Sequence, residues 1–358
     1  MIIENINLVN FRNYSNLKIE FEKGLNFLYG PNATGKTSLV EAVYYLSLAR
    51  SFRTSIDAHL IKHKCTRAQI NAKLSAQEIK RTIDIELSTE GKKIFLNQKQ
   101  IKKISELSNI VNVIYFIPKD VDLLKDSPKQ RRLFLNLSIS KVSKSYLEKV
   151  TSYEKLLKER NNVLKDVNVN IDLLDVLTEQ MVYLSKDIYL YRKKYINELN
   201  EVLLDLYQKI TNSTDKVKII YTPFVDNEEK YLELARLEFS NSKDLDLKRK
   251  QTTKGIQKED FYLIKNQRNI GTYGSQGENR LAIIALKLSP YELIHKEEDK
   301  PIVILDDILS ELDDKHQKFL IEYISNLNQV FLTSTKKNEI ENCVYYKIEN
   351  ESIVKENM

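Results

Sequence analysis

Glycine, cysteine and long apolar runs are scarce in this sequence. Its 358 residues include only 8 glycines and 2 cysteines, Cys65 and Cys343. Two cysteines cannot form a disulfide framework or a cysteine zinc site, which favours the reducing environment of the cytosol. No apolar run approaches the roughly 18 residues of a membrane span. The first residues resemble a strand rather than a signal peptide, so we expect a cytoplasmic protein that does not bind membranes.

The sequence also has no large excess of basic over acidic residues. The chain has 56 Lys and Arg against 50 Asp and Glu, a net charge of +6. Such a small excess gives no strong overall field, so any polyanion must be bound by local basic patches. The four histidines form no cluster. His59 and His63 could share one face of a helix, but ordinary surface positions explain them better than a metal site does.

Against this scarcity of glycine, the segment 30–37 stands out. It reads GPNATGKT and matches the phosphate-binding loop G-x-x-x-x-G-K-[ST]. Gly30 and Gly35 allow the loop to wrap a phosphate, and its N–H groups, together with the next helix N-terminus, form an anion site. We expect Lys36 to reach the β- and γ-phosphates of a nucleotide and Thr37 to offer its hydroxyl to Mg²⁺.

The surroundings of this loop also favour nucleotide binding. A buried strand is expected at 25–29 and a helix at 38–46, the order that this motif requires. Two antiparallel strands are expected before it, whereas in GTPases and kinases the loop usually follows the first strand. The nucleotide-binding residues predicted in this segment are Gly30, Pro31, Asn32, Ala33, Thr34, Gly35, Lys36, Thr37 and Ser38.

A pair of acids near the end of the chain supplies the second element that such a site needs. The apolar run 302–305 predicts a buried strand, and Asp306 and Asp307 follow it directly. At this position Asp306 would hold Mg²⁺ through water, and Asp307 would orient or deprotonate the attacking water. We therefore predict Thr37 and Asp306 as metal ligands, and Lys36 and Asp307 as catalytic residues.

A second anion site is predicted in front of a later helix. Ser275, Gln276 and Gly277 precede the apolar helix expected at 281–288. A hydroxyl, a flexible glycine and a helix N-terminus together favour a phosphate. A chain that already has one phosphate site could use the second on the ATP of another copy, so that two copies close head to tail around two nucleotides.

The composition changes between residues 128 and 210. This stretch has no internal glycine or proline, and apolar residues recur at spacings of three, four and seven within 146–164 and 177–206. The pattern predicts two helices in an antiparallel hairpin. We therefore expect an α/β ATPase domain, with a mixed sheet and an antiparallel β-subdomain, divided between 1–127 and 211–358. An all-helical lobe is inserted at 128–210.

Motifs along nearly the whole chain resemble those of the bacterial RecF family, which belongs with the ABC-type ATPases of the SMC group. They are NFRNY at 10–14, the loop at 30–37, SFRT at 51–54, PKD at 118–120, Ser127-Pro128 with Arg131-Arg132, YGSQG at 273–277 and LDDILSELD at 305–313. The resemblance implies an ABC-type P-loop ATPase head with an inserted helical lobe. It also implies that Arg12 approaches the phosphates and that residues 275–280 form the signature motif, which acts on ATP across a dimer. Residues 310–313 would form the D-loop, and 118–120 lie near the expected Q-loop.

The same resemblance implies a function in recombinational DNA repair and replication-fork maintenance, within the SOS response to DNA damage. Such proteins form ATP-dependent homodimers and bind double-stranded, gapped or single-strand/double-strand junction DNA. They work with RecO and RecR to load RecA. The implied activity is a weak, DNA-dependent ATPase that uses ATP and Mg²⁺.

Two departures from the family pattern bear on these expectations. Glu278 and Asn279 stand where the family often has two glutamines, which adds a negative charge beside the γ-phosphate site. Asn136 replaces a frequent aspartate.

Support for DNA contact is weaker, since each basic candidate alone is more often a solvated charge. The candidates are Arg50, Arg53, Lys92, Lys93, Lys129, Arg131, Arg132, Lys248, Arg249 and Lys250.

Three other functions are compatible with a phosphate-binding loop. In the motor subunit of a transporter, the segment between the phosphate loop and the signature motif is much shorter than the one between Lys36 and Ser275 in this chain. Such a subunit also has a switch histidine, where this chain has Thr333-Ser334-Thr335. An SMC- or RecN-like structural ATPase needs a far longer coiled coil. A nucleotide switch that never hydrolyses ATP stays open, because Asp307 is one methylene shorter than the usual catalytic glutamate.

Overall fold

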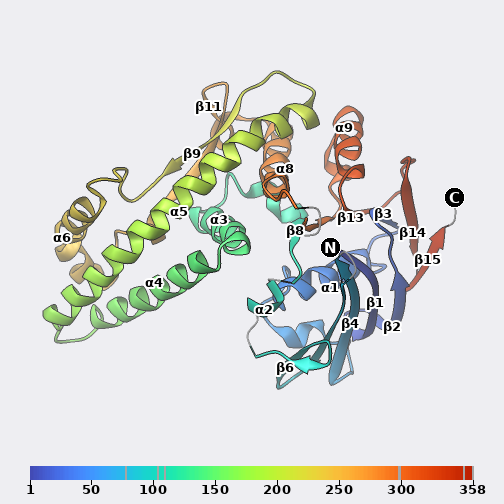
Figure 1. Ribbon diagram of the computed structural model, residues 1–358, viewed down its shortest axis with the longest axis horizontal. Coiled ribbons are helices and arrows are strands. Elements are labelled where there is room, and N and C mark those ends of the chain that lie inside the picture. Colours follow the sequence, from blue (N-terminus) through green and yellow to red (C-terminus); the bar gives the residue numbers. More distant parts are fainter. Residues whose placement is uncertain (77–78, 103–104, 109, 297–299, 350, 357–358) are drawn as a thin grey trace. The chain divides into compact units, whose positions relative to one another are not determined.

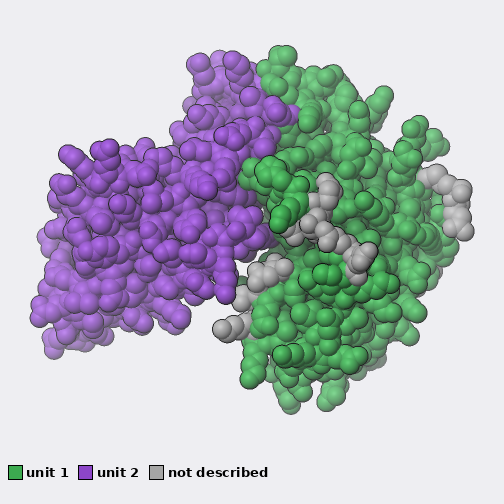
Figure 2. Space-filling model, viewed as in Figure 1, with its two compact units in different colours: residues 1–121, 206–214, 284–358 green, residues 122–205, 215–283 purple. Residues whose placement is uncertain are grey.

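The computed structural model describes residues 1–76, 79–102, 105–108, 110–296, 300–349 and 351–356 (Figure 1). The chain divides into two compact units. Unit 1 contains residues 1–121, 206–214 and 284–358, and unit 2 contains residues 122–205 and 215–283 (Figure 2). Within the described part of the chain, no helix has the length and apolar character needed to cross a membrane.

The first sheet of unit 1 is built on parallel strands. Its order is β15-β14-β3-β13-β12-β8, with only β15 antiparallel to its neighbour. All residues of β12 and β13 are buried, as expected for central strands covered on both faces. The strands are β3 (Gly24–Tyr29), β8 (Val113–Phe116), β12 (Ile302–Leu305), β13 (Gln329–Ser334), β14 (Cys343–Glu349) and β15 (Ser352–Glu356).

The second sheet of unit 1 is antiparallel. Its order is β2-β1-β4-β5-β6-β7, and alternate residues of β4 are buried. The strands are β1 (Ile2–Phe11), β2 (Tyr14–Glu20), β4 (Arg67–Ala76), β5 (Ile79–Ser88), β6 (Gly91–Leu96) and β7 (Lys99–Gln100). Helix α1 (Lys36–Leu48) shares one hydrophobic core with both sheets. The mixed sheet and the antiparallel β-subdomain confirm the predicted fold class.

Helices dominate unit 2. Those lying wholly or partly in it are α3 (Pro128–Val142), α4 (Lys144–Val163), α5 (Ile171–Thr211), α6 (Tyr231–Arg249), α7 (Ile270–Tyr273) and α8 (Gln276–Glu292). Helices α4 and α5 lie side by side (Figure 1). Their contacts run in opposite order, since Lys149 Nζ meets Asp187 Oδ2 at 2.5 Å and Arg160 Nε meets Thr178 Oγ1 at 2.8 Å. The two helices therefore run antiparallel.

The compact units differ from the division expected at residues 128 and 210. Residues 128–210 are helical, but those in unit 2 pack with 215–283, which include a sheet of β9 (Val217–Thr222), β10 (Asp260–Lys265) and β11 (Arg268–Asn269). The physical reason is that polar side chains of α5 have their partners in the segment 215–283. The buried Arg192 of α5 forms an ion pair with Glu259. Asn200 also accepts from the N–H of Ile219 at 2.7 Å and donates to its carbonyl at 3.1 Å. The hairpin's buried polar groups thus need partners outside 128–210.

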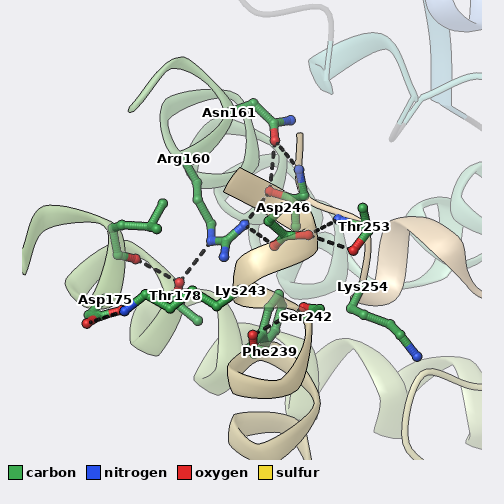
Figure 3. Close-up of polar contacts among 12 residues, drawn as sticks. Arg160, Asn161, Asp175, Thr178, Phe239, Ser242, Lys243, Asp246, Thr253 and Lys254 are labelled. Carbon is green, nitrogen blue, oxygen red and sulfur yellow. Dashed lines mark hydrogen bonds and ion pairs between the residues drawn. The ribbon is translucent and has the colours of Figure 1, made fainter. Parts of the chain in front are cut away.

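A second buried ion pair lies deeper in unit 2 (Figure 3). Arg160 of α4 and Asp246 of α6 are almost fully buried, and Arg160 Nη1 donates to Asp246 Oδ2 at 2.8 Å. The same guanidinium donates to Thr178 Oγ1 at 2.8 Å and Thr252 Oγ1 at 2.7 Å. The other carboxylate oxygen of Asp246 accepts from the N–H and hydroxyl of Thr253. Both buried charges are therefore paired and hydrogen-bonded, as their burial requires.

Candidate functional site

A cavity of about 590 Å³ opens in unit 1 beside the loop between β3 and α1. The loop and the start of α1 line it with Asn32, Ala33, Gly35, Lys36, Thr37 and Ser38. Arg12, Asp306 and Asp307 line it from other segments. Gly30, Pro31 and Thr34 belong to the loop but not to the cavity lining. The structure thus brings together the predicted phosphate loop, the predicted acids and the predicted arginine.

The shape of the loop depends on its two glycines. Gly35 has a φ of 116°, and a Cβ atom there would come within 2.5 Å of the Tyr14 hydroxyl. A Cβ atom on Gly30 would come within 2.2 Å of the carbonyl oxygen of Ile348. Neither contact leaves room for a side chain. The loop can therefore follow this path only with glycine at both positions.

Lys36 folds back over the loop. Its ammonium donates to the carbonyl oxygens of Gly30 and Pro31, each at 2.7 Å. The side chain is buried, and this burial lowers the pKa of Lys36, while the charges of Asp307 and Asp306 oppose the change. The cation therefore lies against the loop that is predicted to receive the phosphates.

Thr37 and Asp306, the two predicted metal ligands, contact each other directly. The Thr37 hydroxyl donates to Asp306 Oδ1 at 3.2 Å, and Thr333 Oγ1 donates to the same oxygen at 2.7 Å. The sheet explains this meeting, because β3, β12 and β13 are parallel and end at one edge. Burial raises the pKa of Asp306, and the two hydroxyl bonds partly offset that rise.

Asp307 differs from its neighbour. Its backbone φ is 51°, and its N–H donates to Thr333 Oγ1 at 2.9 Å. Its side-chain Oδ1 is buried and finds no hydrogen-bond donor among the described residues. Burial raises the pKa of this carboxyl group. A buried oxygen without a donor is costly, so it marks a place where a ligand or a water can supply one.

Two arginines share one buried carboxylate at the side of the cavity. Arg12 binds Glu41 through Nε at 2.8 Å and Nη2 at 2.6 Å, and its Nη1 donates to the carbonyl of His59 at 2.8 Å. Arg53, which also lines the cavity, lies 3.6 Å from Glu41. The hydroxyl of Ser51 donates to Glu41 as well. Glu41 therefore fixes Arg12 firmly and Arg53 loosely.

The sequence prediction missed Glu41 and Thr333. Glu41 is fully buried on α1, and an acid within the apolar segment SLVEAVYYL was the available signal. His59 and His63 are exposed, as predicted, and they also line the cavity. No cluster of three or more potential metal-ligating side chains occurs in the described ranges. The signal for Thr333 was a polar residue at the end of a buried apolar strand.

The second predicted anion site belongs to unit 2 and does not line this cavity. Ser275 Oγ accepts from the N–H of Glu278 at 3.2 Å, and Glu278 Oε2 accepts from the N–H of Ser275 at 2.8 Å. This reciprocal pair is a capping box at the start of α8. Ser275, Gln276 and Gly277 are exposed, and a Cβ atom on Gly277 would meet nothing within 4 Å. This helix start is accessible from outside.

Both departures from the family pattern have partners in unit 2. The carboxylate of Glu278 forms an ion pair with Lys265, so its negative charge is compensated. Asn136 Oδ1 accepts from the Tyr146 hydroxyl at 2.6 Å and from Arg192 Nη2 at 2.9 Å. An amide thus serves as an acceptor beside a buried guanidinium.

Several candidate DNA contacts have internal partners. Arg131 is buried and binds Asp260 through Nε at 2.7 Å, so it is a structural residue rather than a DNA contact. Arg132 donates to the carbonyl of Glu259 at 2.7 Å. Lys92 pairs with Asp57 at 2.9 Å. The exposed candidates are Arg50, Arg53, Lys93, Lys129, Lys248, Arg249 and Lys250.

The cavity residues fit a magnesium nucleotide. Lys36, Arg12 and Arg53 supply positive charge to the cavity. Asp307, which has an unsatisfied oxygen, lines the cavity together with Thr37 and Asp306, whose hydroxyl and carboxylate oxygens are ligands that Mg²⁺ prefers.

Comparison with known proteins gives one consistent relationship. A family model described as the RecF/RecN/SMC N terminal domain matches residues 2–355. The chain is 34% identical over 362 residues to the DNA replication and repair protein RecF of Clostridium tetani, covering 98% of each chain. It is 34% identical over 369 residues to the protein of the same name from Geobacillus thermodenitrificans, covering 99% of each chain.

Solved structures agree with the sequence relatives. The structure of the recombination mediator protein RecF-ATP in RecFOR pathway matches with a TM-score of 0.89 at 32% identity, covering 99% of this chain and 97% of the other. The corresponding RecF-ATPrS structure matches with a TM-score of 0.88. An Smc head domain from Pyrococcus furiosus matches with a TM-score of 0.62 at 16% identity, which is similarity of fold alone.

Proposed function

The chain belongs to the RecF family of DNA replication and repair proteins, and from this premise we propose that it is an ATP-controlled DNA-binding protein of recombinational repair. Its fold is that of an SMC-type ABC ATPase head. Two copies close when ATP is bound, hold DNA while closed, and reopen after slow hydrolysis. The observation that carries the proposal is the buried, unpartnered oxygen of Asp307 in a cavity that the phosphate loop also lines.

The nucleotide site is assigned to unit 1. The loop residues 30–38 would hold the phosphates, with Lys36 as the nearest cation, and Arg12 and Arg53 beside them. Thr37 and Asp306 would hold Mg²⁺, which supplies charge neutralisation at the phosphates when it is bound. Their existing contact of 3.2 Å supports this pairing.

Asp307 is assigned the role of orienting or deprotonating the attacking water. Its raised pKa brings it closer to a useful general base, and its free oxygen can accept a hydrogen bond from that water. Thr333 fixes the backbone of Asp307 and so aims this side chain.

The second half of the composite site is assigned to another copy of the chain. Ser275, Gln276 and Gly277 stand exposed at a helix start, and Gly277 leaves open space in which a phosphate can approach the backbone closely. The head-to-tail dimer would place this signature motif, residues 275–280, on the nucleotide of its partner.

DNA contact is assigned to exposed basic side chains and is expected to depend strongly on salt and weakly on sequence. The preferred substrate is gapped or junction DNA, and the partners are RecO and RecR, through which RecA is loaded. The assignment of RecO and RecR is supported by the similar structures of RecF in the RecFOR pathway.

Sedimentation velocity tests the proposal. The protein is run with ATP, with ADP or without nucleotide, each with and without gapped duplex DNA. We expect a dimer only with ATP, and stronger DNA association in that state. Ser275→Arg should abolish the dimer and leave ATP binding by the monomer nearly normal. A monomer under every condition would overturn the mechanism.

A second function, that of a nucleotide switch, is compatible with the same cavity. If ATP drives dimerisation but no phosphate is released, the protein is a nucleotide switch. Asp307→Asn separates the two functions, because it should trap the ATP dimer on DNA in a hydrolysing protein and change nothing in a switch.

A further inference from the structure

The carboxylate of Glu278 performs two tasks at the start of α8. Its Oε2 accepts from the N–H of Ser275 at 2.8 Å, which completes the capping box. Its Oε1 contacts the ammonium of Lys265, at the end of β10. The cap therefore fixes the backbone of Ser275, and the ion pair fixes the carboxylate that makes the cap.

This arrangement creates a charge problem for the signature motif. A carboxylate in the first turn favours the helix itself, because it faces the positive end of the helix dipole. The same negative charge repels any phosphate that approaches Ser275. Lys265 also lies 3.3 Å from Asp215, so its ammonium contacts two carboxylates.

Protonation cannot remove the charge of Glu278. The hydrogen bond from Lys265, followed by that from the N–H of Ser275, holds the pKa of Glu278 below its ordinary value. The carboxylate therefore stays ionised at neutral pH. Compensation has to come from a cation fixed in the fold.

We propose that Lys265 is a positioning residue of the signature motif, whose ammonium neutralises Glu278 so that the start of α8 can receive a phosphate. The proposal rests on the function assigned above to residues 275–280. Lys265 acts through Glu278. The ligand that would bind at the start of α8 is the terminal phosphate of a nucleotide held by a second copy of this chain.

A double-mutant cycle tests the proposal with Lys265→Met, Glu278→Gln and the double variant. The readout is the ATP concentration that gives half-maximal dimerisation in sedimentation. We expect K265M to raise that concentration about tenfold, because the carboxylate of Glu278 loses its counter-charge. E278Q should lower that concentration, since glutamine can still cap Ser275 and no longer repels the phosphate. The double variant should need far less ATP than K265M, because the charge that Lys265 neutralises is gone.

Two controls separate charge from folding. Lys265→Arg keeps the positive charge and should dimerise normally. Monomeric K265M should bind a fluorescent ATP analogue normally, because the cavity of the phosphate loop belongs to unit 1. The K265M defect should also shrink as salt is raised, since salt screens partly exposed charges.

The outcomes distinguish this inference from the proposed function. Normal dimerisation of K265M would overturn the role of Lys265 and leave the proposed function standing. A double variant as defective as K265M would also overturn it, because Lys265 would then support the fold and not the charge balance. If the unaltered protein does not dimerise with ATP, both proposals fall together.

Discussion

Buried charges have different surroundings in the two units. In unit 2, Arg160 and Asp246 are almost fully buried, and their charged groups pair with each other and with neighbouring threonines (Figure 3). In the cavity of unit 1, Lys36 donates to two backbone carbonyls, and Asp307 keeps an oxygen without a donor among the described residues. Burial lowers the pKa of Lys36 and raises the pKa of Asp307, and both shifts favour the neutral form of the side chain.

This difference separates buried charges that stabilise the fold from buried charges that a bound ligand would pair. A paired and hydrogen-bonded ion pair is satisfied by the fold itself, and breaking it costs stability. A buried charge with incomplete partners raises the free energy of the protein without ligand, and a bound ligand can lower it.

Arg160→Met should destabilise the protein by about 3–5 kcal/mol, because Asp246 would remain buried without its cation. Urea unfolding followed by circular dichroism measures the loss. The matched control, Arg160→Met with Asp246→Leu, replaces both charges with apolar groups and should recover most of it. If the single variant were as stable as the unaltered protein, the pair would not be structural.

Lys36→Met should weaken nucleotide binding at least a hundredfold, which corresponds to about 2.7 kcal/mol. Its stability should change little, since the hydrogen bonds of the Lys36 ammonium within the described residues go to two carbonyl oxygens of its own loop. Titration with a fluorescent ATP analogue and urea unfolding are measured on the same preparation. Intact ATP-dependent DNA binding in this variant would contradict the assigned function.

Glu41→Gln should cost about 2 kcal/mol of stability, because the NH₂ group of glutamine cannot accept from Arg12, so one of the two hydrogen bonds is lost together with the counter-charge. Nucleotide affinity should fall as well, since both guanidiniums lose the carboxylate that holds them. Ser51→Ala removes a smaller contact with the same carboxylate and serves as the control. A loss of stability with unchanged affinity would make Glu41 purely structural, like Asp246.

Asp307→Asn should stabilise the protein by about 0.5 kcal/mol at pH 8. The folded-state pKa of Asp307 is raised, so the folded protein binds its proton more tightly than the unfolded chain does. The stability contributed by this group is therefore present at low pH and is lost as pH rises from the ordinary pKa of aspartate through the raised one. Thermal unfolding between pH 4 and pH 8 should show the advantage of asparagine growing with pH, and a constant difference would contradict the assignment.

The sequence allowed the local features of the site to be predicted. The strand, loop and helix around Lys36 and the apolar strand before Asp306 carry short-range signals, and the structure places both where they were expected. The fold class followed from the same signals together with the family resemblance.

The features that the sequence did not reveal depend on contacts between distant residues. Arg12 and Glu41 are far apart in the chain, and either alone resembles an ordinary charged residue. Arg160 occupies a position in an otherwise apolar helical stripe, and its partner Asp246 lies on another helix. The inclusion of residues 215–283 in unit 2 depends on the same kind of contact, since Glu259 and Ile219 complete the polar groups of α5.

The hydroxyl of Thr333 has one hydrogen, and it forms different hydrogen bonds with Asp306 and with Asp307. The hydrogen is donated to Asp306, while the oxygen accepts from the backbone of Asp307. The side chain of Asp307 therefore receives nothing from Thr333, and two adjacent, chemically identical aspartates become inequivalent. A valine would fill nearly the same volume in this fully buried position and would leave Asp306 with the hydroxyl of Thr37 alone. The chemical asymmetry at the end of β12 thus depends partly on the direction in which the O–H bond of Thr333 points.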